Sequence, residues 1–240
     1  MPPVTLITGA NKGIGLAAAT ILATKHKHHV LIGGRNLSAV EKVATELKSQ
    51  GAQATPIHLD LDSEPSITTA VSTITSQFGK LDILVNNAGI LLDTKDPNMS
   101  THILFTKTFT TNVIGTAVLT EALLPLLRKA TAPRVIFVSS RMGSLHQATV
   151  KDTPFYATDY KAYDASKAAV NMLALNYARI LEDVGGKVNA VCPGLVSTNL
   201  TGYTGYGTTP EVGATRIVEL ATVEDSPNRT FSDQNGVIAW

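Results

Sequence analysis

Residues 4–24 read VTLITGANKGIGLAAATILAT. Val4–Thr8 is short, uncharged and rich in β-branched residues, which is typical of a strand that is buried on both faces. Gly9, Gly13 and Gly15 follow with the spacing Gly-x-x-x-Gly-x-Gly, and an apolar helical pattern comes next. A strand, a glycine turn and a helix in this order bring backbone N–H groups close to a pyrophosphate at the positive end of the helix. We interpret the stretch as a nucleotide-binding turn, with an ordinary glycine-rich turn as the alternative.

The same alternation of strand and helix continues along the chain and predicts an α/β fold. Strands are expected at residues 4–8, 30–33, 54–59, 83–85, 134–138 and 188–191, with a short closing strand at 237–238. Helices are expected at residues 16–24, 37–50, 63–78, 100–129, 163–182 and 210–221. Strands that are joined through helices pair in parallel, so we predict one doubly wound parallel sheet with helices on both faces. Residues 1–240 are predicted to form a single domain.

The composition favours a globular protein without a nucleic-acid or membrane partner. Hydrophobic residues make up 44% of the 240 positions, and the net charge is only +1. A nearly neutral chain lacks the basic surface that nucleic acids and anionic membranes attract. No uninterrupted apolar run approaches the ~20 residues of a membrane span, and the first residues show no basic leader. The single cysteine, Cys192, excludes an internal disulfide, so we expect a soluble cytoplasmic protein.

The end of the second predicted strand indicates which dinucleotide the chain prefers. At this point of a dinucleotide site, a carboxylate bonds the ribose 2′-hydroxyl of NAD and repels a 2′-phosphate. Here the strand ends in Gly34 and Arg35, and Lys12 of the glycine turn is a second cation. Guanidinium groups pair well with phosphates, so the sequence predicts NADP(H). Asp60 ends the third strand and either touches the adenine or is a loop acid.

Further candidate residues follow the carboxyl ends of later strands, where ligands of open α/β sheets bind. Asn86-Asn87-Ala88-Gly89 follows the fourth strand, Ser139-Ser140 the fifth, and Cys192-Pro193-Gly194 the sixth. Asn112 interrupts the apolar stripe of the helix expected at 100–129, and it is either a satisfied core amide or a site residue. Cys192 is most simply a small buried residue.

Tyr163 and Lys167 lie four residues apart within a helical pattern and should therefore share a helix face. A free tyrosine has a pKa near ~10 and is a poor acid or base at neutral pH. A neighbouring ammonium stabilises the phenolate, so we expect a lowered pKa that suits general acid–base catalysis. Lys25–His29 contains three histidines, but their spacing is not that of a metal site, and we predict a solvated loop and no bound metal.

These motifs, taken together and in this order, resemble the short-chain dehydrogenase/reductase family, in its compact single-domain branch. The resemblance covers nearly the whole chain. It implies a Rossmann-type sheet of about seven strands and an NADPH-dependent reduction of a ketone or aldehyde, of the carbonyl reductase type. It rests on Thr8–Gly15, Asn86–Gly89, Asn112, Ser140, Tyr163 with Lys167, and Pro193-Gly194 with Thr198.

The resemblance also assigns roles to individual residues. Tyr163 would donate a proton to the carbonyl, Lys167 would tune Tyr163 and bond the nicotinamide ribose, and Ser140 would polarise the substrate oxygen. Asn112 would position a water molecule in the proton relay. The cofactor would contact Gly9, Asn11, Lys12, Gly13, Ile14, Gly15, Arg35, Asp60, Leu61, Asn87, Ala88, Gly89, Tyr163, Lys167, Pro193, Gly194, Val196 and Thr198.

One departure from the family concerns the segment before Tyr163. Between Ser140 and Tyr163 lie 163 − 140 − 1 = 22 residues, about ten more than the family's compact members usually have. We expect the extra residues, in the loop around 148–160, to form one wall of the substrate pocket, and the Tyr-rich segment 200–209 to form a flap. The insertion could block helix pairing, so a monomer, a dimer and a tetramer all stay open. Two other functions also stay open: a non-redox epimerase, dehydratase or cyclase, and a non-catalytic NADP-sensing protein.

Overall fold

A computed structural model describes residues 2–240 and shows one sheet with the strand order β3-β2-β1-β4-β5-β6-β7-β8. All neighbouring pairs from β3 to β7 are parallel, and β8 pairs with β7 in the antiparallel sense. The strands are β1 (Val4–Thr8), β2 (His29–Gly34), β3 (Gln53–His58), β4 (Ile83–Asn86), β5 (Arg134–Val138), β6 (Lys187–Val191), β7 (Phe231–Asp233) and β8 (Gly236–Val237). The strand order reverses between β1 and β4, which is where ligands of doubly wound sheets bind.

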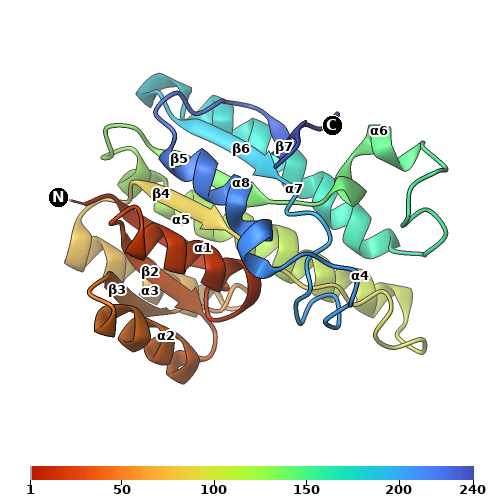
Figure 1. Ribbon diagram of the computed structural model, residues 1–240, viewed down its shortest axis with the longest axis horizontal. Coiled ribbons are helices and arrows are strands. Elements are labelled where there is room, and N and C mark those ends of the chain that lie inside the picture. Colours follow the sequence, from red (N-terminus) through yellow and green to blue (C-terminus); the bar gives the residue numbers. More distant parts are fainter. Residues whose placement is uncertain (1) are drawn as a thin grey trace.

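Helices cover both faces of the sheet. Figure 1 shows α1 and α8 side by side in front of the sheet, with α5 and α7 behind it. The helices are α1 (Gly13–Thr24), α2 (Leu37–Ser49), α3 (Glu64–Phe78), α4 (Thr101–Phe109), α5 (Thr116–Leu127), α6 (Leu145–Ala148), α7 (Lys161–Ile180) and α8 (Pro210–Thr222). The Rossmann-type α/β architecture predicted from the sequence is therefore confirmed.

The core consists of two apolar clusters, one on each face of the sheet. One cluster joins the strands to α1, α2 and α8, and Leu22 and Ile217 are two of its fully buried members. The other joins the strands to α3, α5 and α7, and it includes Ile74 and Leu119. Because consecutive strand residues point to opposite faces, the uncharged run Val4–Thr8 supplies both clusters, and all five of its residues are buried.

The carboxyl end of the chain adds one strand, β7, that the sequence did not reveal. β7 holds only three residues, two of them polar, and it lies at the edge of the parallel array. A run this short carries no recognisable alternation of apolar and polar residues. The closing strand expected at 237–238 is present as β8, so the sheet has eight strands rather than about seven.

The segment Lys25–His29 is only in part the solvated loop that its composition suggested, because Lys25, His26 and Lys27 are exposed but the last two residues are not. His28 is buried, and its Nδ1 lies 2.9 Å from the hydroxyl oxygen of Thr5 on β1. His29 is the first residue of β2, and its ring packs edge-on against Phe78. Within residues 2–240 no three metal-ligating side chains come together. These two histidines thus belong to the amino-terminal edge of the sheet.

The helix expected at residues 100–129 contains an irregularity. Thr110–Gly115, between α4 and α5, is wound as a π-helix, and Asn112 lies within it. Such bulges often occur at functional sites because they turn one side chain out of the regular helical register. The continuous run Thr101–Leu127 is long and apolar enough to cross a membrane by length and composition alone. Its α5 portion, however, contributes buried leucines to the core of the sheet, so we regard it as a core helix.

Candidate active site

The glycine turn after β1 has the backbone conformation that its sequence predicts. Gly9 and Gly13 have positive φ values of 64° and 56°, which side chains with a Cβ rarely adopt. A Cβ on Gly15 would lie 2.5 Å from Nδ2 of Asn87 and 2.6 Å from the carbonyl oxygen of Gly9. The turn is therefore closely packed against the end of β4, and larger residues would push the two apart.

The first turn of α1 provides the kind of anion site that a pyrophosphate requires. Lys12 is the N-cap residue, and its side chain makes no capping hydrogen bond within residues 2–240. The first four N–H groups of a helix have no partner inside the helix, and the helix dipole favours an anion there. The predicted residues Asn11, Lys12, Gly13, Ile14 and Gly15 all lie in this turn. The turn therefore fits the diphosphate of a dinucleotide.

The ends of β2 and β3 form the expected adenosine side. Arg35 follows β2 and is exposed. Lys12 in the glycine turn is also exposed, and its Nζ lies 3.2 Å from Oδ1 of Asn199. Asp60 follows β3, and its Oδ1 accepts a hydrogen bond of 3.1 Å from the backbone of Asp62. Leu61 between them is buried. Arg35 and Asp60 thus follow neighbouring strands at this end of the sheet, whereas the ammonium of Lys12 bonds Asn199 in the segment after β6.

The end of β4 is fastened to the end of β1 by a threonine that the sequence analysis did not single out. The hydroxyl of Thr8 accepts hydrogen bonds from the backbone N–H groups of Asn87 and Ala88, at 3.0 and 2.9 Å. The Asn87 side chain donates in return to the carbonyl oxygen of Thr8 at 2.8 Å. These bonds hold Asn87, Ala88 and Gly89 at the point where the strand order reverses.

The structure brings Ser140, Tyr163 and Lys167 to one place above β5. Tyr163 and Lys167 are both buried on α7, and Nζ of Lys167 lies 5.5 Å from the centre of the Tyr163 ring. The ammonium also donates to the carbonyl oxygen of Val138 at 2.8 Å. A Cβ on Gly143 would lie 2.5 Å from the backbone carbon of Lys167, so the turn after Ser140 packs directly on α7. The expectation that Tyr163 and Lys167 share a face is confirmed by this geometry.

The pKa of Tyr163 is raised, whereas the sequence suggested that it would be lowered. Burial raises the pKa of the phenol, and Cys192, Asp164 and Asp93 act in the same direction, while the nearby Ser140 hydroxyl acts against them. Burial also lowers the pKa of Lys167 to about 8. The expectation of a lowered tyrosine pKa is therefore wrong for this structure, because the loss of solvation on burial is the largest influence on the phenol.

Asn112 lies close to this group, but its side chain already has several partners. Its amide pairs with both the N–H and the carbonyl of Ile90, at 2.8 and 2.9 Å. Its Nδ2 also donates to the hydroxyl of Ser166 at 3.0 Å. Both amide protons are therefore used, and a water molecule could bond only the remaining lone pair of Oδ1 or the backbone. The role of Asn112 in a proton relay stays a prediction.

The residues after β6 cover the glycine turn. Thr198 is buried and would lie 3.3 Å from a Cβ placed on Gly13, which puts the segment against the first turn of α1. Val196 is also buried, whereas Pro193 is half-buried and Gly194 is exposed. The thiol of Cys192 is buried and accepts hydrogen bonds from the backbone of Arg141 and Gly194, as expected for a structural cysteine.

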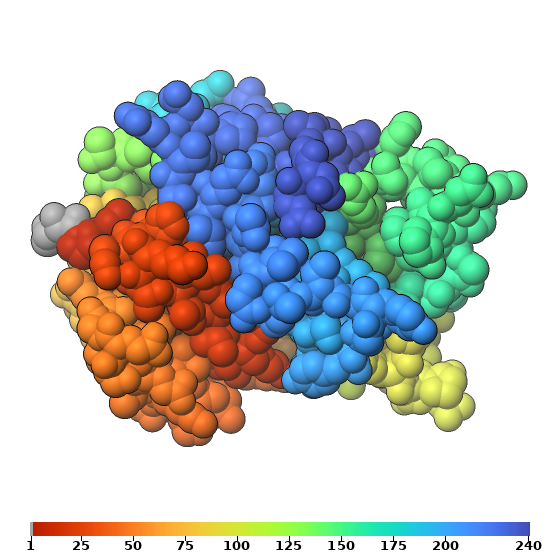
Figure 2. Space-filling view, viewed as in Figure 1, coloured from red at the N-terminus to blue at the C-terminus, as the bar shows by residue number. Residues whose placement is uncertain are grey.

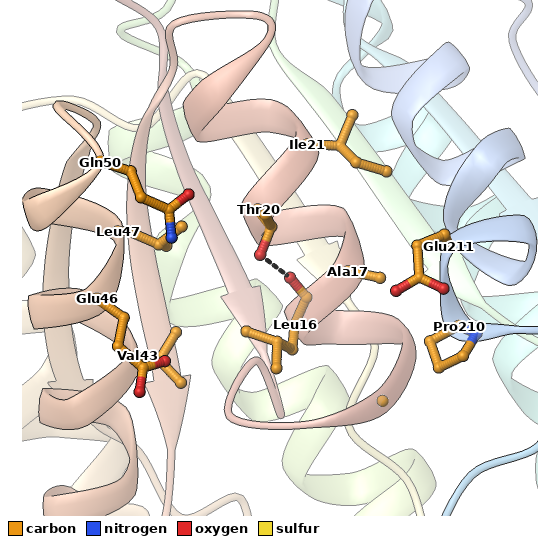
Figure 3. A pocket seen from close by; sticks show the side chains of 11 residues that line it. Leu16, Ala17, Thr20, Ile21, Val43, Glu46, Leu47, Gln50, Pro210 and Glu211 are labelled. Carbon is orange, nitrogen blue, oxygen red and sulfur yellow. Dashed lines mark hydrogen bonds between the residues drawn. The ribbon is translucent and has the colours of Figure 1, made fainter.

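Two hollows lie outside this group of residues. Figure 3 shows the first, of about 300 Å³, between α1, α2 and the start of α8; its walls are mainly apolar, and Glu46 and Glu211 stand at its sides. The second, of about 240 Å³, lies over the carboxyl ends of β5, β6 and β7. Arg141 and Asp233 form an ion pair of 2.5 Å in its wall. Arg141 and Cys192 line the second hollow close to Ser140, but neither Ser140 nor Tyr163 lines either of these two hollows.

The model of the short chain dehydrogenase family matches residues 3–206, which is most of the chain. The chain belongs to the short-chain dehydrogenase family. It is 37% identical to the short-chain dehydrogenase anuI of Penicillium roqueforti, over 99% of this chain and 97% of that protein. It is 30% identical to carbonyl reductase [NADPH] 1 of Macaca fascicularis, over 99% and 98%. The crystal structure of NADPH-bound carbonyl reductase from chicken fatty liver superposes with a TM-score of 0.86, at 25% identity and with 100% and 99% of the two chains covered.

This short-chain dehydrogenase carries its insertion at the exposed end of the molecule. The segment 144–160 forms the short helix α6 and a series of turns, and it projects as a green lobe in Figure 2. The carboxyl terminus fastens its start, because the hydroxyl of Ser144 donates to Ala239 at 2.6 Å and the backbone of His146 donates to Trp240 at 3.0 Å. The segment 200–209 is irregular, and the Tyr206 side chain in it is 94% exposed.

Proposed function

We propose that this short-chain dehydrogenase is an NADPH-dependent reductase that converts a ketone or an aldehyde to an alcohol. The observation that carries the proposal is the buried pair Tyr163 and Lys167, one helical turn apart, with Ser140 beside it and the glycine turn at the same edge of the sheet. This arrangement supports acid–base chemistry next to a dinucleotide. The NADPH-bound and NADPH-named relatives support the choice of reaction and cofactor.

In the proposed reaction the bound cofactor supplies a hydride to the carbonyl carbon. The hydroxyl of Ser140 holds the carbonyl oxygen and stabilises the negative charge that develops there. Tyr163 gives its phenolic proton to that oxygen, which completes the alcohol. The ammonium of Lys167 stabilises the phenolate that remains, and the protein's main contribution is the alignment of these groups.

The turnover of the Tyr163→Phe variant tests this assignment. The substitution removes one hydroxyl from a buried ring and leaves the glycine turn untouched, so NADPH should still bind. Loss of a general acid lowers rates by roughly 10²–10⁴-fold. The measurement is the oxidation of NADPH at 340 nm with a panel of ketones and aldehydes, together with a fluorescence titration of NADPH. Unchanged turnover in this variant would remove Tyr163 from the mechanism.

The preference for NADPH is proposed to come from Arg35 and Lys12, the two exposed cations of the adenosine side. Each can pair with a ribose 2′-phosphate, and neither can accept a hydrogen bond from a 2′-hydroxyl as a carboxylate does. The Arg35→Asp variant should therefore bind NADPH at least tenfold more weakly, while its affinity for NADH stays the same or increases. An unchanged ratio of the two dissociation constants would contradict the cofactor assignment.

We also propose a class of substrate and a cellular compartment for the enzyme. Its partner is a small carbonyl compound, and we propose the segment 144–160 as one wall of the substrate pocket. The tyrosines of that segment and of residues 200–209 support an aromatic or otherwise apolar ketone. We place the reaction in the cytoplasm. Light scattering on the purified chain determines whether the insertion leaves it a monomer or allows a dimer or tetramer.

A further inference from the structure

The N-cap residue of the helix that carries Tyr163 makes no capping hydrogen bond with its side chain. Tyr160 is the N-cap residue of α7, and its side chain bonds none of the first N–H groups among residues 2–240. Asp93, in the loop after β4, takes this place. Its Oδ1 accepts from the backbone N–H of Ala162 at 2.8 Å, and its Oδ2 accepts from that of Tyr163 at 3.3 Å. The cap of this helix thus comes from a residue about 70 positions earlier in the chain.

The main chain of Tyr163 is held from both sides by this loop. Asp93 binds its N–H, while the hydroxyl of Ser166 donates to its carbonyl oxygen at 2.7 Å. Ser166 accepts in turn from the side chain of Asn112, which pairs with the backbone of Ile90 in the same loop. The loop after β4 therefore bonds the N–H of Tyr163 directly, at a length slightly above the usual range, and reaches its carbonyl oxygen through Asn112 and Ser166.

We propose that Asp93 is a positioning residue for Tyr163, because its carboxylate fixes the first turn of α7 beside Ser140. This inference rests on the proposed function. When the carboxylate is removed, the N–H groups of Ala162 and Tyr163 lose the hydrogen-bond partner that they have within residues 2–240, and the interaction of the charge with the helix dipole is lost as well. Tyr163 lies in that first turn, so fraying of the turn moves the phenol directly. Lys167 lies a full turn deeper and is held by Val138.

The other acids near the start of α7 do not duplicate this contact. Asp159 accepts from the backbone of Lys161 at 3.2 Å and pairs with the ammonium of the same residue at 2.8 Å. Asp164 belongs to the helix itself, and Oδ1 of its carboxylate is buried without a hydrogen-bond partner within residues 2–240. Neither bonds the N–H groups of Ala162 and Tyr163. Asp93 is therefore the residue to substitute when the bonds to these two N–H groups are to be tested.

The test compares Asp93→Ala and Asp93→Asn with the control variant Asp96→Ala. Asp96 lies in the same loop, but its carboxylate accepts from the backbone of Asn98 and not from α7. The measured quantities are KM for the carbonyl compound and kcat per site. For kcat per site, the concentration of active sites is determined by titration with NADPH. Counting only sites that bind NADPH removes the contribution of unfolded protein from kcat.

Asp93→Ala should lower kcat per site by roughly 10- to 100-fold, because a displacement of about 1 Å at the reacting groups has this effect, whereas KM stays within about threefold. Asp93→Asn keeps an oxygen that can accept from Ala162, so it should lose less. Asp96→Ala should leave kcat per site unchanged. The inference is overturned if kcat per site of Asp93→Ala stays within twofold of the parent, or if Asp93→Asn loses as much as Asp93→Ala.

Hydrogen exchange of the peptide that spans residues 160–166 separates this inference from the proposed function. The amides of Ala162 and Tyr163 should exchange at least tenfold faster in Asp93→Ala than in the parent, because local opening of the first turn becomes easier. If the parent reduces no carbonyl compound, the proposed function fails, but faster exchange still supports the capping contact. Unchanged exchange overturns the inference whether or not the protein is active.

Discussion

The buried histidine at the edge of the sheet should make the stability of this protein depend on pH. His28 is buried beside Thr5, and burial is the main cause that lowers its pKa from 6.5 to about 4; His26 and Arg134 act in the same direction, and Asp82 acts against it. In the unfolded chain the same side chain takes up a proton near its ordinary pKa. Between these two values the unfolded state binds more protons than the folded state, so stability falls as the pH falls.

The size of the effect follows from the two pKa values. The full difference, from 6.5 to about 4, corresponds to about 3 kcal/mol at roughly 1.4 kcal/mol for each pH unit. The contribution is present in full above about pH 7, and about 2 kcal/mol of it should be lost between about pH 8 and about pH 5. A loss of this size is a large fraction of the stability of a typical domain.

Urea unfolding of the parent and of the His28→Gln variant at a series of pH values measures this loss. Glutamine does not titrate, and its amide can still bond the hydroxyl of Thr5. All other titrating groups, His29 included, cancel in the difference between the two proteins. The free energy of unfolding of the parent should fall by about 2 kcal/mol more than that of the variant between about pH 8 and about pH 5. His102→Gln, at an exposed site on α4, serves as the control. Parallel pH profiles for the parent and His28→Gln would refute the reasoning.

Three further outcomes are expected. Gly143→Ala places a methyl group 2.5 Å from the backbone of Lys167, and thermal unfolding and kcat should show a loss of about 1–3 kcal/mol in stability and a lower turnover. Burial and Asp93 raise the pKa of Asp164 to about 7, so Asp164→Asn should raise Tm more at about pH 8, where the native acid is ionised, than at about pH 5. The pKa of Lys167 is lowered to about 8, so kcat for reduction should fall as the pH rises through that value, and a flat profile up to about pH 10 would contradict this.

The parts of the site that the sequence predicted are those encoded by neighbouring residues. The glycine turn could be predicted because a buried strand, three glycines and a helix follow one another within 21 residues, and each has a conformational preference of its own. The shared face of Tyr163 and Lys167 follows from the helical repeat alone. The same local signals located six of the strands, while β7 was missed because three residues contain too little pattern.

The contacts that the sequence could not predict join segments that are far apart in the chain. Asp93 and Ala162 are separated by 69 positions, and nothing in the composition of the loop after β4 marks Asp93 as different from its exposed neighbour Asp96. Thr8 was recognised as the end of a strand and the first residue of the glycine motif, but not as the residue whose hydroxyl holds the end of β4. The depth at which His28 and Tyr163 are buried depends on how the layers pack, and this depth determines the direction of their pKa shifts.

The burial of Tyr163 bears on the direction of the proposed reaction. Burial raises the pKa of the phenol, so Tyr163 stays protonated at neutral pH, which is the form that can give a proton to a developing alkoxide. Below about pH 8 the buried Lys167 is an ammonium and can stabilise the phenolate after that transfer. Oxidation of an alcohol needs the opposite starting state, a phenolate, and burial makes that state harder to form. The same low-solvent environment that the sequence could not reveal therefore favours a proton donor over a base at neutral pH, which is the state that the proposed reduction needs.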